Sequence, residues 1–452
     1  MVKDLTAGEP RKVLWRFSLP LLGSIIFQQL YNIADSLVAG KFIGDEALSA
    51  VGNSYEVTLI YLAFAFGCNM GCSVVIARLF GAQKLRDVKS AVNTTYIASG
   101  ILCILLMIFG FTLSPVLLRM INTPEKIMSD TLLYLNIYTG GLLFLFFYNI
   151  STGIFSALGD SRTPFIFLAV SSVTNIFMDI WFVCSFKMGI SGVAWATFIC
   201  QGVSCMAAVI TVFIKLRQIR CEEKPRLFSM PLFKQIVRIA VPSILQQSFI
   251  SVGNILIQSI VNSFGTVVIA GYSAAIKVNN FAITTLSTLG NAMSNYTAQN
   301  FGAGKPERIR KGGRAGMAMS AAIAVLFGVL YVVLKDPFIK LFIKVENTDS
   351  IEVGKMFLLL VAPTYILPGV KLIADGTLRG LGKMKFFMVS TFTDLSLRVI
   401  LAFILSELFQ SPVGIWCAWP VGWIISTVMS LIFYRVQVRK EIAQVKFKQI
   451  QC

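Results

Sequence analysis

Charged side chains inside long apolar segments are the residues of this sequence that could do chemistry. Placing a charge at the centre of a membrane helix costs about 2.5–3.5 kcal/mol on insertion scales, so such a residue either carries a function or is neutralised by a partner. The charged residues that lie away from the ends of these segments are Asp35, Glu56, Asp179, Lys277, Lys371, Asp375, Asp394 and Arg398. They are the starting point for any proposed activity.

The charges of the second half include two self-neutralising pairs. Lys371 and Asp375 are four residues apart, as are Asp394 and Arg398. On a helix this spacing puts both members of a pair on one face, where they can form an ion pair. We therefore expect these four residues to be structural. Lys277 could face a central cleft or lie at the membrane interface.

Asp35 and Asp179 differ because neither has a basic residue within one helical turn. Asn175 lies four residues before Asp179, and Thr197 lies in the next apolar segment. Two carboxylates, an amide and a hydroxyl could surround a Na⁺ ion, and carboxylates in a dry pocket could equally take up protons. The alternative is that the two acids line separate water-filled crevices.

The sequence gives no support for an enzyme. It contains no histidine, which excludes a histidine proton relay and a histidine-liganded metal site. It has no HExxH motif and no evident pair of nucleophile and base. We expect no cofactor other than a coupling ion, H⁺ or Na⁺.

Composition indicates a membrane protein that crosses the bilayer many times. Of 452 residues, 56% are hydrophobic and 14% are charged, and the mean hydropathy is +0.75. A soluble protein carries about 25% charged residues. The net charge of +18 could suggest nucleic-acid binding. However, Lys and Arg concentrate in the connections that would face the cytoplasm, as the positive-inside rule requires. The acidic residues show no such preference. The charge therefore reports topology.

Twelve apolar segments of membrane-spanning length can be identified. They lie near residues 13–40, 50–77, 91–118, 131–157, 164–186, 190–214, 236–262, 267–297, 315–334, 354–378, 386–406 and 413–434. This count predicts an all-α protein with twelve transmembrane helices and both termini in the cytoplasm.

The second half of the sequence repeats the first at a separation of 221–223 residues. The repeated features are Pro20 and Pro242, residues 77–84 and 298–305, residues 153–159 and 376–382, and Gly192 and Gly414. Each repeat has six spans, an even number, so both halves enter the membrane in the same direction. We expect two six-helix bundles related by a pseudo-two-fold axis along the membrane normal.

This repeat sets the expected domain boundaries. Residues 1–216 form an N-terminal six-helix lobe, residues 217–233 a cytoplasmic linker, and residues 234–452 a C-terminal six-helix lobe. A channel is the simplest alternative to a transporter, but no segment resembles a selectivity filter. An ATP-driven pump is disfavoured because Gly302–Lys305 lacks the upstream glycine of a P-loop and is followed by Pro306.

The chain resembles the multidrug and toxic compound extrusion (MATE) family over nearly its whole length. The matching features are Pro20 followed by Asp35, ARLFGAQ at 77–83, GDSRTP at 159–164, NIFMD at 175–179, the glycine- and alanine-rich run at 189–197, and the repeated FGAGK at 301–305. The resemblance implies two six-helix lobes and exchange of organic cations for Na⁺ or H⁺.

The resemblance also implies roles for particular residues of the first lobe. Asp35, Asn175, Asp179 and Thr197 match the cation or proton site of the family. Residues matching the lining of the same lobe's cavity are Gln28, Tyr31, Tyr134 and Asn149, with Tyr138 as an alternative to Tyr134. Simple packing or interfacial anchoring is the competing interpretation of the tyrosines. Pro20 is expected to let its helix bend.

One departure from the family narrows the comparison. A branch of the family carries a glutamate in its seventh helix, where this sequence has about Ile250 among uncharged residues. The sequence is therefore closest to the DinF-like bacterial branch, with coupling in the first lobe.

These observations predict a secondary multidrug efflux transporter that works by alternating access. Its substrates would be amphipathic cationic drugs, and it would be a monomer in the bacterial plasma membrane without a nucleic-acid partner. The rival is a flippase for a lipid-linked saccharide from the same superfamily. A flippase is expected to hold a diphosphate with basic residues, and the candidates here are Lys277, Lys371 and Arg398, two of which lie in the pairs above.

Overall fold

The computed structural model of the chain is built from helices. It describes residues 4–38, 42–121, 123–219, 221, 223–343 and 346–451, and within these ranges the side chains of 32–37, 45, 46, 48, 56 and 446–451 lie outside the description. The helices of the first half are α1 Pro10–Val38, α2 Asp45–Gly81, α3 Leu85–Met120, α4 Glu125–Gly140, α5 Leu142–Ala157, α6 Arg162–Ile180, the π-helical turn η2 Trp181–Ser185, and α7 Ile190–Gln218.

The second half follows the same order. Its helices are α8 Met230–Asn262, α9 Thr266–Gly302, α10 Pro306–Val333, the short α11 Lys335–Lys340, α12 Thr348–Val361, the 3₁₀ turn η3 Ala362–Thr364, α13 Ile366–Gly380, α14 Met384–Phe409 and α15 Val413–Gln451. Within the ranges given above, the structure contains no β-strand.

The helices have the length and apolar character of membrane spans. In the described part of the chain, ten helices could each cross a bilayer, and two pairs of shorter helices could each do so together. An α-helix satisfies its own backbone hydrogen bonds, which is a requirement in lipid. Every segment predicted from the sequence coincides with one of these helices or pairs, so the prediction of an all-α membrane protein with twelve spans is confirmed.

Two of the predicted spans are broken, at equivalent places in the two halves. Helices α4 and α5 meet at a bend of 49°, and α12 and α13 meet at a bend of 51°. The first break carries Gly140 and Gly141, and the second carries Pro363, which has no backbone N–H to continue a helix. The single segments predicted at 131–157 and 354–378 are therefore corrected to bent pairs.

The backbone itself records the internal repeat. Residues with positive φ recur in register between the halves: Gly44 with Gly265, Gln83 with Gly304, Gly159 with Gly382, and Gly189 with Gln410. The members of each pair are 221–223 residues apart, the same separation that relates the sequence motifs. The repeat therefore extends to the turns between helices as well as to the helices.

The chain forms two compact units, and the first part of the first helix of each half belongs to the unit of the other half. One unit contains Met1–Asp4 and Leu19–Ile244, and the other contains Leu5–Ser18 and Leu245–Cys452. We call them unit 1 and unit 2. Helix α1 therefore begins in unit 2 and continues in unit 1, while α8 begins in unit 1 and continues in unit 2. The lobe boundaries expected at residues 216 and 234 do not anticipate this exchange.

Prolines lie close to both crossing points. Pro20 follows the α1 crossing by one residue, and Pro242 precedes the α8 crossing at Ile244. A proline inside a helix removes one backbone hydrogen bond and weakens the helix locally. Both helices that pass from one unit to the other are thus weakened near the place where they pass.

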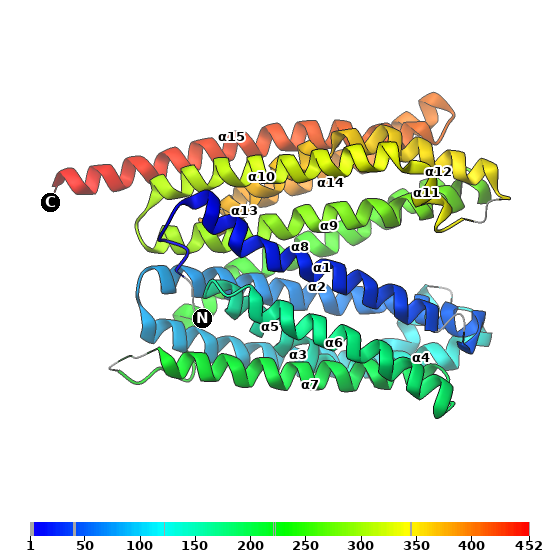
Figure 1. The fold of residues 1–452 in the computed structure, drawn as a ribbon, viewed down its shortest axis with the longest axis horizontal. Helices are drawn as coiled ribbons and strands as arrows, with labels where there is room; N and C mark the ends of the chain where they lie inside the picture. The colour runs from blue at the N-terminus through cyan, green and yellow to red at the C-terminus, as the bar shows by residue number, and fades with distance from the viewer. Residues whose placement is uncertain are drawn as a thin grey trace. The chain divides into compact units, whose positions relative to one another are not determined.

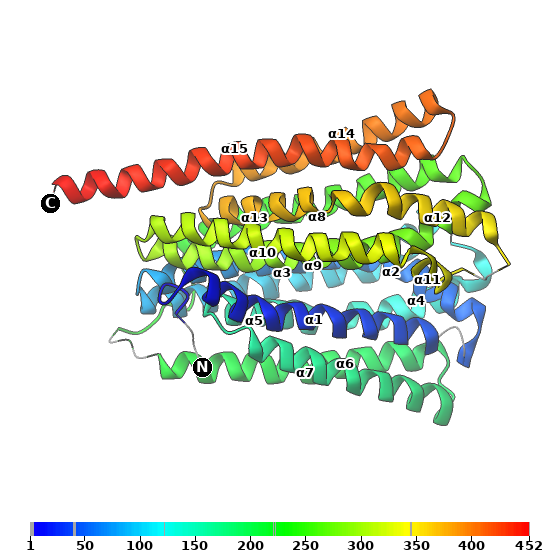
Figure 2. The same ribbon diagram turned by 45° about the horizontal axis from the view of Figure 1, so that its top comes forward.

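Each unit is held together by long contacts between helices. In unit 1, α2 packs along α5 and α6 packs along α7, and in unit 2, α9 packs along α13 and α14 packs along α15 (Figures 1 and 2). Glycines allow the closest approaches: a Cβ on Gly376 would lie only 2.1 Å from the carbonyl oxygen of Gly290. Similarly, a Cβ on Gly71 would lie 2.8 Å from the carbonyl oxygen of Ile236, because the start of α8 packs against α2.

Candidate ion and substrate site

Helix α6 positions two of the predicted ion-site residues. Asn175 and Asp179 lie one turn apart on one face, and their exposed fractions are 2% and 0%. Directly after this turn the chain continues as the π-helical turn η2. Such turns are frequent at functional sites. Helix α6 thus presents a buried carboxyl and a buried amide on one face, which are groups that can bind a proton or a small cation.

A second contact connects α1 to α7. The hydroxyl of Tyr31 lies 3.3 Å from Oγ1 of Thr197, and both side chains are half-buried. Helices α6 and α7 meet nearby, where the thiol of Cys200 lies 3.4 Å from Sδ of Met178. Since Thr197 and Cys200 are three residues apart on α7, and Met178 adjoins Asp179, the hydroxyl pair belongs to the same stretch of unit 1 as the buried acid.

Asp35 lies in α1, four residues after Tyr31, but its side chain is outside the described part of the structure. The predicted grouping of Asp35 with Asp179 therefore stays a prediction. The structure does place Asn175 and Asp179 together on α6, and Tyr31 with Thr197 between α1 and α7.

The other predicted cavity residues have different surroundings. Gln28 is exposed on α1, whereas Tyr134 is 7% exposed and packs in a core cluster with Ala50, Ile190 and Val193. Packing, the competing interpretation of the tyrosines, thus describes the surroundings of Tyr134. Asn149 is half-buried, and its Nδ2 donates to the carbonyl of its own helix four residues earlier.

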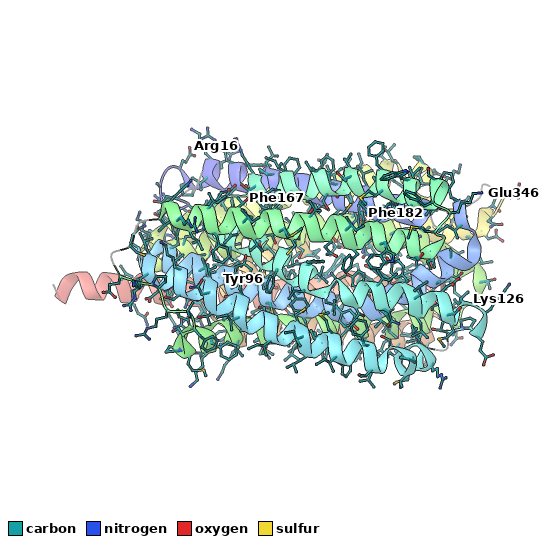
Figure 3. The ribbon with its side chains drawn as sticks, turned by 90° about the horizontal axis from the view of Figure 1, so that it is seen from below. Arg16, Tyr96, Lys126, Phe167, Phe182 and Glu346 are labelled. Atoms are coloured by element: carbon teal, nitrogen blue, oxygen red, sulfur yellow. The ribbon has the colours of Figure 1, made fainter. Side chains whose placement is uncertain are left out.

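Aromatic rings pack against one another along the helices of unit 1. The rings of Phe27 on α1 and Phe165 on α6 pack edge to face, with centroids 5.8 Å apart. The ring of Tyr96 packs against that of Phe147, and its hydroxyl lies 2.7 Å from that of Ser151. Figure 3 labels three of the rings of unit 1 at separate places along it: Tyr96 on α3, Phe167 on α6 and Phe182 in the π-helical turn. Such rings can bind the apolar parts and the charge of an organic cation.

The charges of the second half form one network in unit 2. Nζ of Lys371 lies 2.8 Å from the Asp375 carboxylate and 3.9 Å from that of Asp394, which in turn lies 3.6 Å from the Arg398 guanidinium. All four side chains are buried, the least so being Arg398 at 9%. The two ion pairs expected from their spacing are present, and Lys371 joins them.

Hydroxyl and aromatic partners complete this network. Ser430 on α15 donates to Asp375 over 2.6 Å, and the Arg398 guanidinium lies 4.6 Å from the centroid of the Trp419 ring. Lys277 is separate: it is exposed, and its Nζ lies 5.4 Å from the centroid of the Phe342 ring. The buried basic groups of the network are therefore neutralised by neighbouring carboxylates.

Arg379 is a buried charge that the sequence reading missed. It is 5% exposed, donates to Oδ1 of Asn291 over 2.7 Å, and stacks on the ring of Phe387 at 5.3 Å. It lies near the end of α13, in the repeated glycine motif, where it could be taken for an exposed residue of a loop. The signal that could have found it is that this motif begins within the last residues of the span predicted at 354–378, so the helix could be expected to continue through Arg379.

Asp160, in the GDSRTP motif, lies just before α6 and caps the start of this helix. One carboxylate oxygen accepts the backbone N–H groups of Arg162 and Thr163 over 3.1 Å each, and the other accepts the Thr163 hydroxyl and the Lys215 ammonium. Burial acts to raise the pKa of the Asp160 carboxyl, but the hydrogen bonds from Lys215 and Thr163 outweigh it and hold this pKa below its usual value. The motif therefore joins α6 to the end of α7.

The equivalent turn of unit 2 carries the opposite charges. Lys383 follows Gly382 as Asp160 follows Gly159, and its ammonium lies 3.0 Å from the carboxylate of Glu441 on α15. Helix α15 is the repeat counterpart of α7. In each unit an ion pair thus connects the turn before the fifth span to the last helix. In unit 1 the turn carries the acid and the helix the base, and in unit 2 the turn carries the base and the helix the acid.

Comparisons with known proteins agree with this architecture. A profile of the MatE family matches residues 20–181 and again residues 242–404. The probable multidrug resistance protein YpnP of Bacillus subtilis is 30% identical over 382 residues, which cover 84% of this chain and 85% of that protein. The probable multidrug resistance protein NorM of Thermotoga maritima is 26% identical and covers 94% of this chain and 92% of its own length.

Solved structures share the fold. A transporter of the MOP superfamily from Pyrococcus furiosus superposes with a TM-score of 0.91 at 21% identity, over 97% of this chain and 98% of that chain. A structure of MATE in complex with MaL6 superposes with a TM-score of 0.92 at the same identity, over 97% of this chain and 99% of that chain. The two matches to the family profile have the register of the internal repeat.

The chain belongs to the MatE family of multidrug and toxic compound extrusion transporters. The protein is accordingly a multi-pass membrane transporter and not an enzyme.

Proposed function

We propose that this protein is a secondary antiporter that exports amphipathic organic cations in exchange for H⁺ or Na⁺. The observation that carries the proposal is the fully buried Asp179, one turn from Asn175 on α6 and close to the Tyr31–Thr197 contact between α1 and α7. An acid in this position can bind a small cation, and it adjoins a contact made by the proline-bearing helix.

The coupling step follows from electrostatics. When Asp179 and Asp35 are ionised, they favour a cation in a site of low dielectric constant. Uptake of H⁺ or Na⁺ removes this negative charge, which weakens the attraction for a cationic substrate and favours a different packing of α1. Pro20 makes bending of α1 inexpensive because the helix lacks one hydrogen bond there. Release of the ion on the other side restores the acids for the next substrate.

The substrate class is supported by the relatives and by the site. Proteins similar to this chain are named multidrug resistance proteins, and unit 1 holds the buried acid Asp179 as well as packed aromatic rings such as Phe27 and Phe165. Such a surface binds amphipathic cations with little selectivity. Since the named relatives are bacterial, we place the protein in the bacterial plasma membrane as a monomer, with both termini in the cytoplasm.

The rival flippase function is disfavoured by the charges in unit 2. A diphosphate would need basic groups free to bind it, but Lys371 and Arg398 are engaged by Asp375 and Asp394. Expression in cells that accumulate a dye distinguishes the two functions, because a drug exporter lowers accumulation and a flippase does not.

The decisive experiment uses purified protein in liposomes that contain a fluorescent organic cation. A proton gradient alone or a sodium gradient alone should drive transport of the cation, and this identifies the coupling ion. Asp179→Asn and Asp35→Asn should each lower gradient-driven transport about tenfold or more, because a neutral amide cannot exchange charge with the ion.

Glu407→Gln is the matched control, since Glu407 is an exposed acid near the end of α14. This variant should transport at the wild-type rate. Wild-type transport by both Asp variants would overturn the proposed coupling. Absence of transport by wild-type protein under either gradient would overturn the antiport function itself.

A further inference from the structure

The short segment before α1 contains two buried residues although it is not part of a helix. Leu5 and Thr6 are 2% and 7% exposed. They belong with Ala7 and Gly8 to unit 2, whereas α1 from Leu19 onward belongs to unit 1. We call Leu5–Gly8 the N-terminal strap. Chain ends are usually poorly ordered unless something holds them, so the partners of the strap need an explanation.

Amides at the end of α9 hold the first residue of the strap. Oε1 of Gln299 accepts the backbone N–H of Leu5 over 2.9 Å, and Nδ2 of Asn300 donates to the Leu5 carbonyl over 3.3 Å. Both amide side chains are fully buried. Together they satisfy the donor and the acceptor of one peptide residue, as a neighbouring β-strand would.

Two cations bind the remaining carbonyls of the strap. Nζ of Lys305 lies 3.1 Å from the carbonyl oxygen of Thr6 and 3.2 Å from its hydroxyl. The Arg308 guanidinium donates to the carbonyls of Gly8, Ala7 and Leu5 at 2.7, 3.3 and 3.4 Å. Its Nε also donates to Oδ1 of Asn300 over 2.9 Å, which fixes the orientation of the planar guanidinium group.

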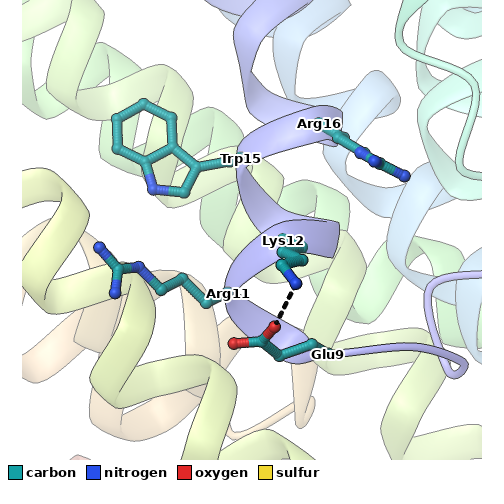
Figure 4. A pocket seen from close by; sticks show the side chains of 5 residues that line it. All are labelled: Glu9, Arg11, Lys12, Trp15 and Arg16. Carbon is teal, nitrogen blue, oxygen red and sulfur yellow. Dashed lines mark ion pairs between the residues drawn. The ribbon is translucent and has the colours of Figure 1, made fainter.

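These contacts form a built peptide site. Its side chains come from the α9–α10 turn, in and next to the FGAGK motif, and all of them bind main-chain atoms of the strap. The chain beside this turn is the dark-blue beginning of the ribbon in Figure 1. After the strap comes the basic first part of α1, with Lys12 paired to Glu9 over 3.2 Å and with Trp15 and Arg16 on the following turn (Figure 4).

The segment before α8 is held in the corresponding way in unit 1. Backbone N–H groups of Arg226 and Ser229 donate to the hydroxyls of Ser90 and Thr94 on α3 over 2.9 and 3.0 Å. Nδ2 of Asn93 donates to the carbonyl of Arg226 over 3.3 Å. The segment before α1 is thus bound by unit 2, although most of the first half belongs to unit 1. The segment before α8 is bound by unit 1, although most of the second half belongs to unit 2.

We propose that the α9–α10 turn is a peptide-binding site whose ligand is the N-terminal strap, and that it anchors the start of α1 to unit 2 throughout the transport cycle. Because α1 continues into unit 1, where it carries Tyr31 and Asp35, a displacement of one unit against the other must then be absorbed within this helix. With the strap anchored, α1 must bend when the units move. Without the anchor, the whole helix could move with unit 1 and would not need to bend. This inference rests on the proposed transport function.

The first arm of the test measures backbone hydrogen exchange of the full-length protein in lipid nanodiscs. In the wild type, the amide of Leu5 should exchange slowly. Gln299→Ala removes its acceptor, and a Lys305→Gln/Arg308→Gln double variant removes the cations, so both should speed exchange in Leu5–Gly8 by about tenfold or more. Arg310→Gln is the matched control, because Arg310 is on the same helix and pairs with Glu307 at the surface.

The second arm measures gradient-driven transport by the same proteins in liposomes. The double variant should transport at least about threefold more slowly than wild type, while Arg310→Gln should match wild type. Arg308→Lys is a milder change, because it keeps the positive charge but removes the several N–H donors of the guanidinium group. It can be used if the double variant is recovered poorly, and it should give an intermediate transport rate.

Each possible result decides a separate point. Fast exchange of Leu5 in the wild type, or unchanged exchange in the double variant, would overturn the peptide site. Fast exchange combined with wild-type transport in the double variant would overturn the anchoring role. Failure of the wild type to transport would contradict the proposed function, but the exchange measurements would still decide whether the peptide site exists.

Discussion

At the scale of single residues, Asp160 shows how one side chain can connect two spans. It caps the start of α6 with one carboxylate oxygen and binds Lys215 near the end of α7 with the other. Lys215 is only 13% exposed, so removal of the carboxylate would leave a nearly buried ammonium with the Thr163 hydroxyl as its remaining hydrogen-bond partner at this turn. An unpaired buried charge is costly, which makes Asp160 the polar residue of unit 1 whose loss we expect to be felt most in stability.

Asp160→Asn should lower the melting temperature of the detergent-solubilised protein. Hydrogen bonds to a charged group are worth about 1.5–3 kcal/mol, which corresponds to about 3–12 °C for a domain of this size. The folded-state pKa of Asp160 is below the ordinary value of 3.8, so its stabilisation is fully present above that value and is lost as pH falls through the folded-state pKa. The difference between wild type and variant should be constant near neutral pH and narrow below about pH 4.

A thermal-shift series from pH 7 to pH 3 measures this difference. A difference that widened toward low pH would contradict the assigned direction of the pKa shift. Glu407→Gln, which changes an exposed acid, should give no difference at any pH.

At the scale of elements, close approach of helices depends on a few glycines rather than on large side chains. The contact between α9 and α13 has the carbonyl oxygen of Gly290 almost against the α-carbon of Gly376. In membrane helices there is little hydrophobic drive for association, so small residues that permit such contacts are an important source of packing energy. The bend between α12 and α13 directs α13 along this contact.

Gly376→Ala should destabilise unit 2 strongly. The new Cβ would lie 2.1 Å from the oxygen of Gly290, and because that oxygen is backbone, the two helices must separate. We expect a loss of about 1–3 kcal/mol, as for overpacking in other cores. The measurement is the melting temperature and the fraction of monodisperse protein after solubilisation.

Gly52→Ala is the matched control for this substitution. Gly52 is also a helical glycine, but among the described residues no heavy atom of a neighbour lies within 4 Å of the point where a Cβ would stand. Alanine should therefore be neutral or slightly stabilising there, by up to about 1 kcal/mol, because it is the better helix former. Equal effects of the two substitutions on the melting temperature would show that the α9–α13 contact is not the cause of the destabilisation by Gly376→Ala.

At the scale of the whole molecule, the fold is one six-span pattern used twice. The positive-φ residues in register, the bends of 49° and 51° and the two matches to the family profile are all expressions of this repeat. In two of these pairs, Gln83 with Gly304 and Gly189 with Gln410, only one member is a glycine, and the first pair allows a test. Gln83 and Gly304 have φ of 57° and 66° at the same turn, but only the second is a glycine.

Gln83→Gly should therefore stabilise the protein. A left-handed conformation costs a non-glycine residue about 1 kcal/mol, which glycine does not incur. The reverse substitution, Gly304→Gln, should destabilise by a similar amount. Melting temperatures of both variants test the equivalence of the two turns. A lower melting temperature for Gln83→Gly would mean that the hydrogen bond from Nε2 of Gln83 to the carbonyl of Phe80 outweighs the strain.

The sequence was sufficient to predict the spans and the repeat because both depend on local hydrophobicity and on motif spacing. The ion pairs Lys371–Asp375 and Asp394–Arg398 were predictable for the same reason, since their members are one helical turn apart. The link between them through Lys371 was not, because it depends on how α13 faces α14.

Other features escaped the sequence reading because they join residues distant in the chain. The strap and its partners are nearly 300 residues apart, and Asp160 and Lys215 are separated by a whole span and more. The breaks at Gly141 and Pro363 lie inside continuous apolar segments, so hydropathy alone does not mark them. For the ion site, the sequence identified Asn175 and Asp179 on one face of α6, and the structure adds the contact of Tyr31 with Thr197.

The exchanged signs of the two turn-to-helix ion pairs bear on how the nascent chain assembles. Two halves with the same fold could dock on each other's helices during synthesis, as happens in proteins with repeated domains. Here a misplaced turn would bring Asp160 against Glu441, or Lys383 against Lys215, and like charges would repel in a poorly solvated place. We therefore expect the pattern of acid and base to favour docking of each turn on the last helix of its own half.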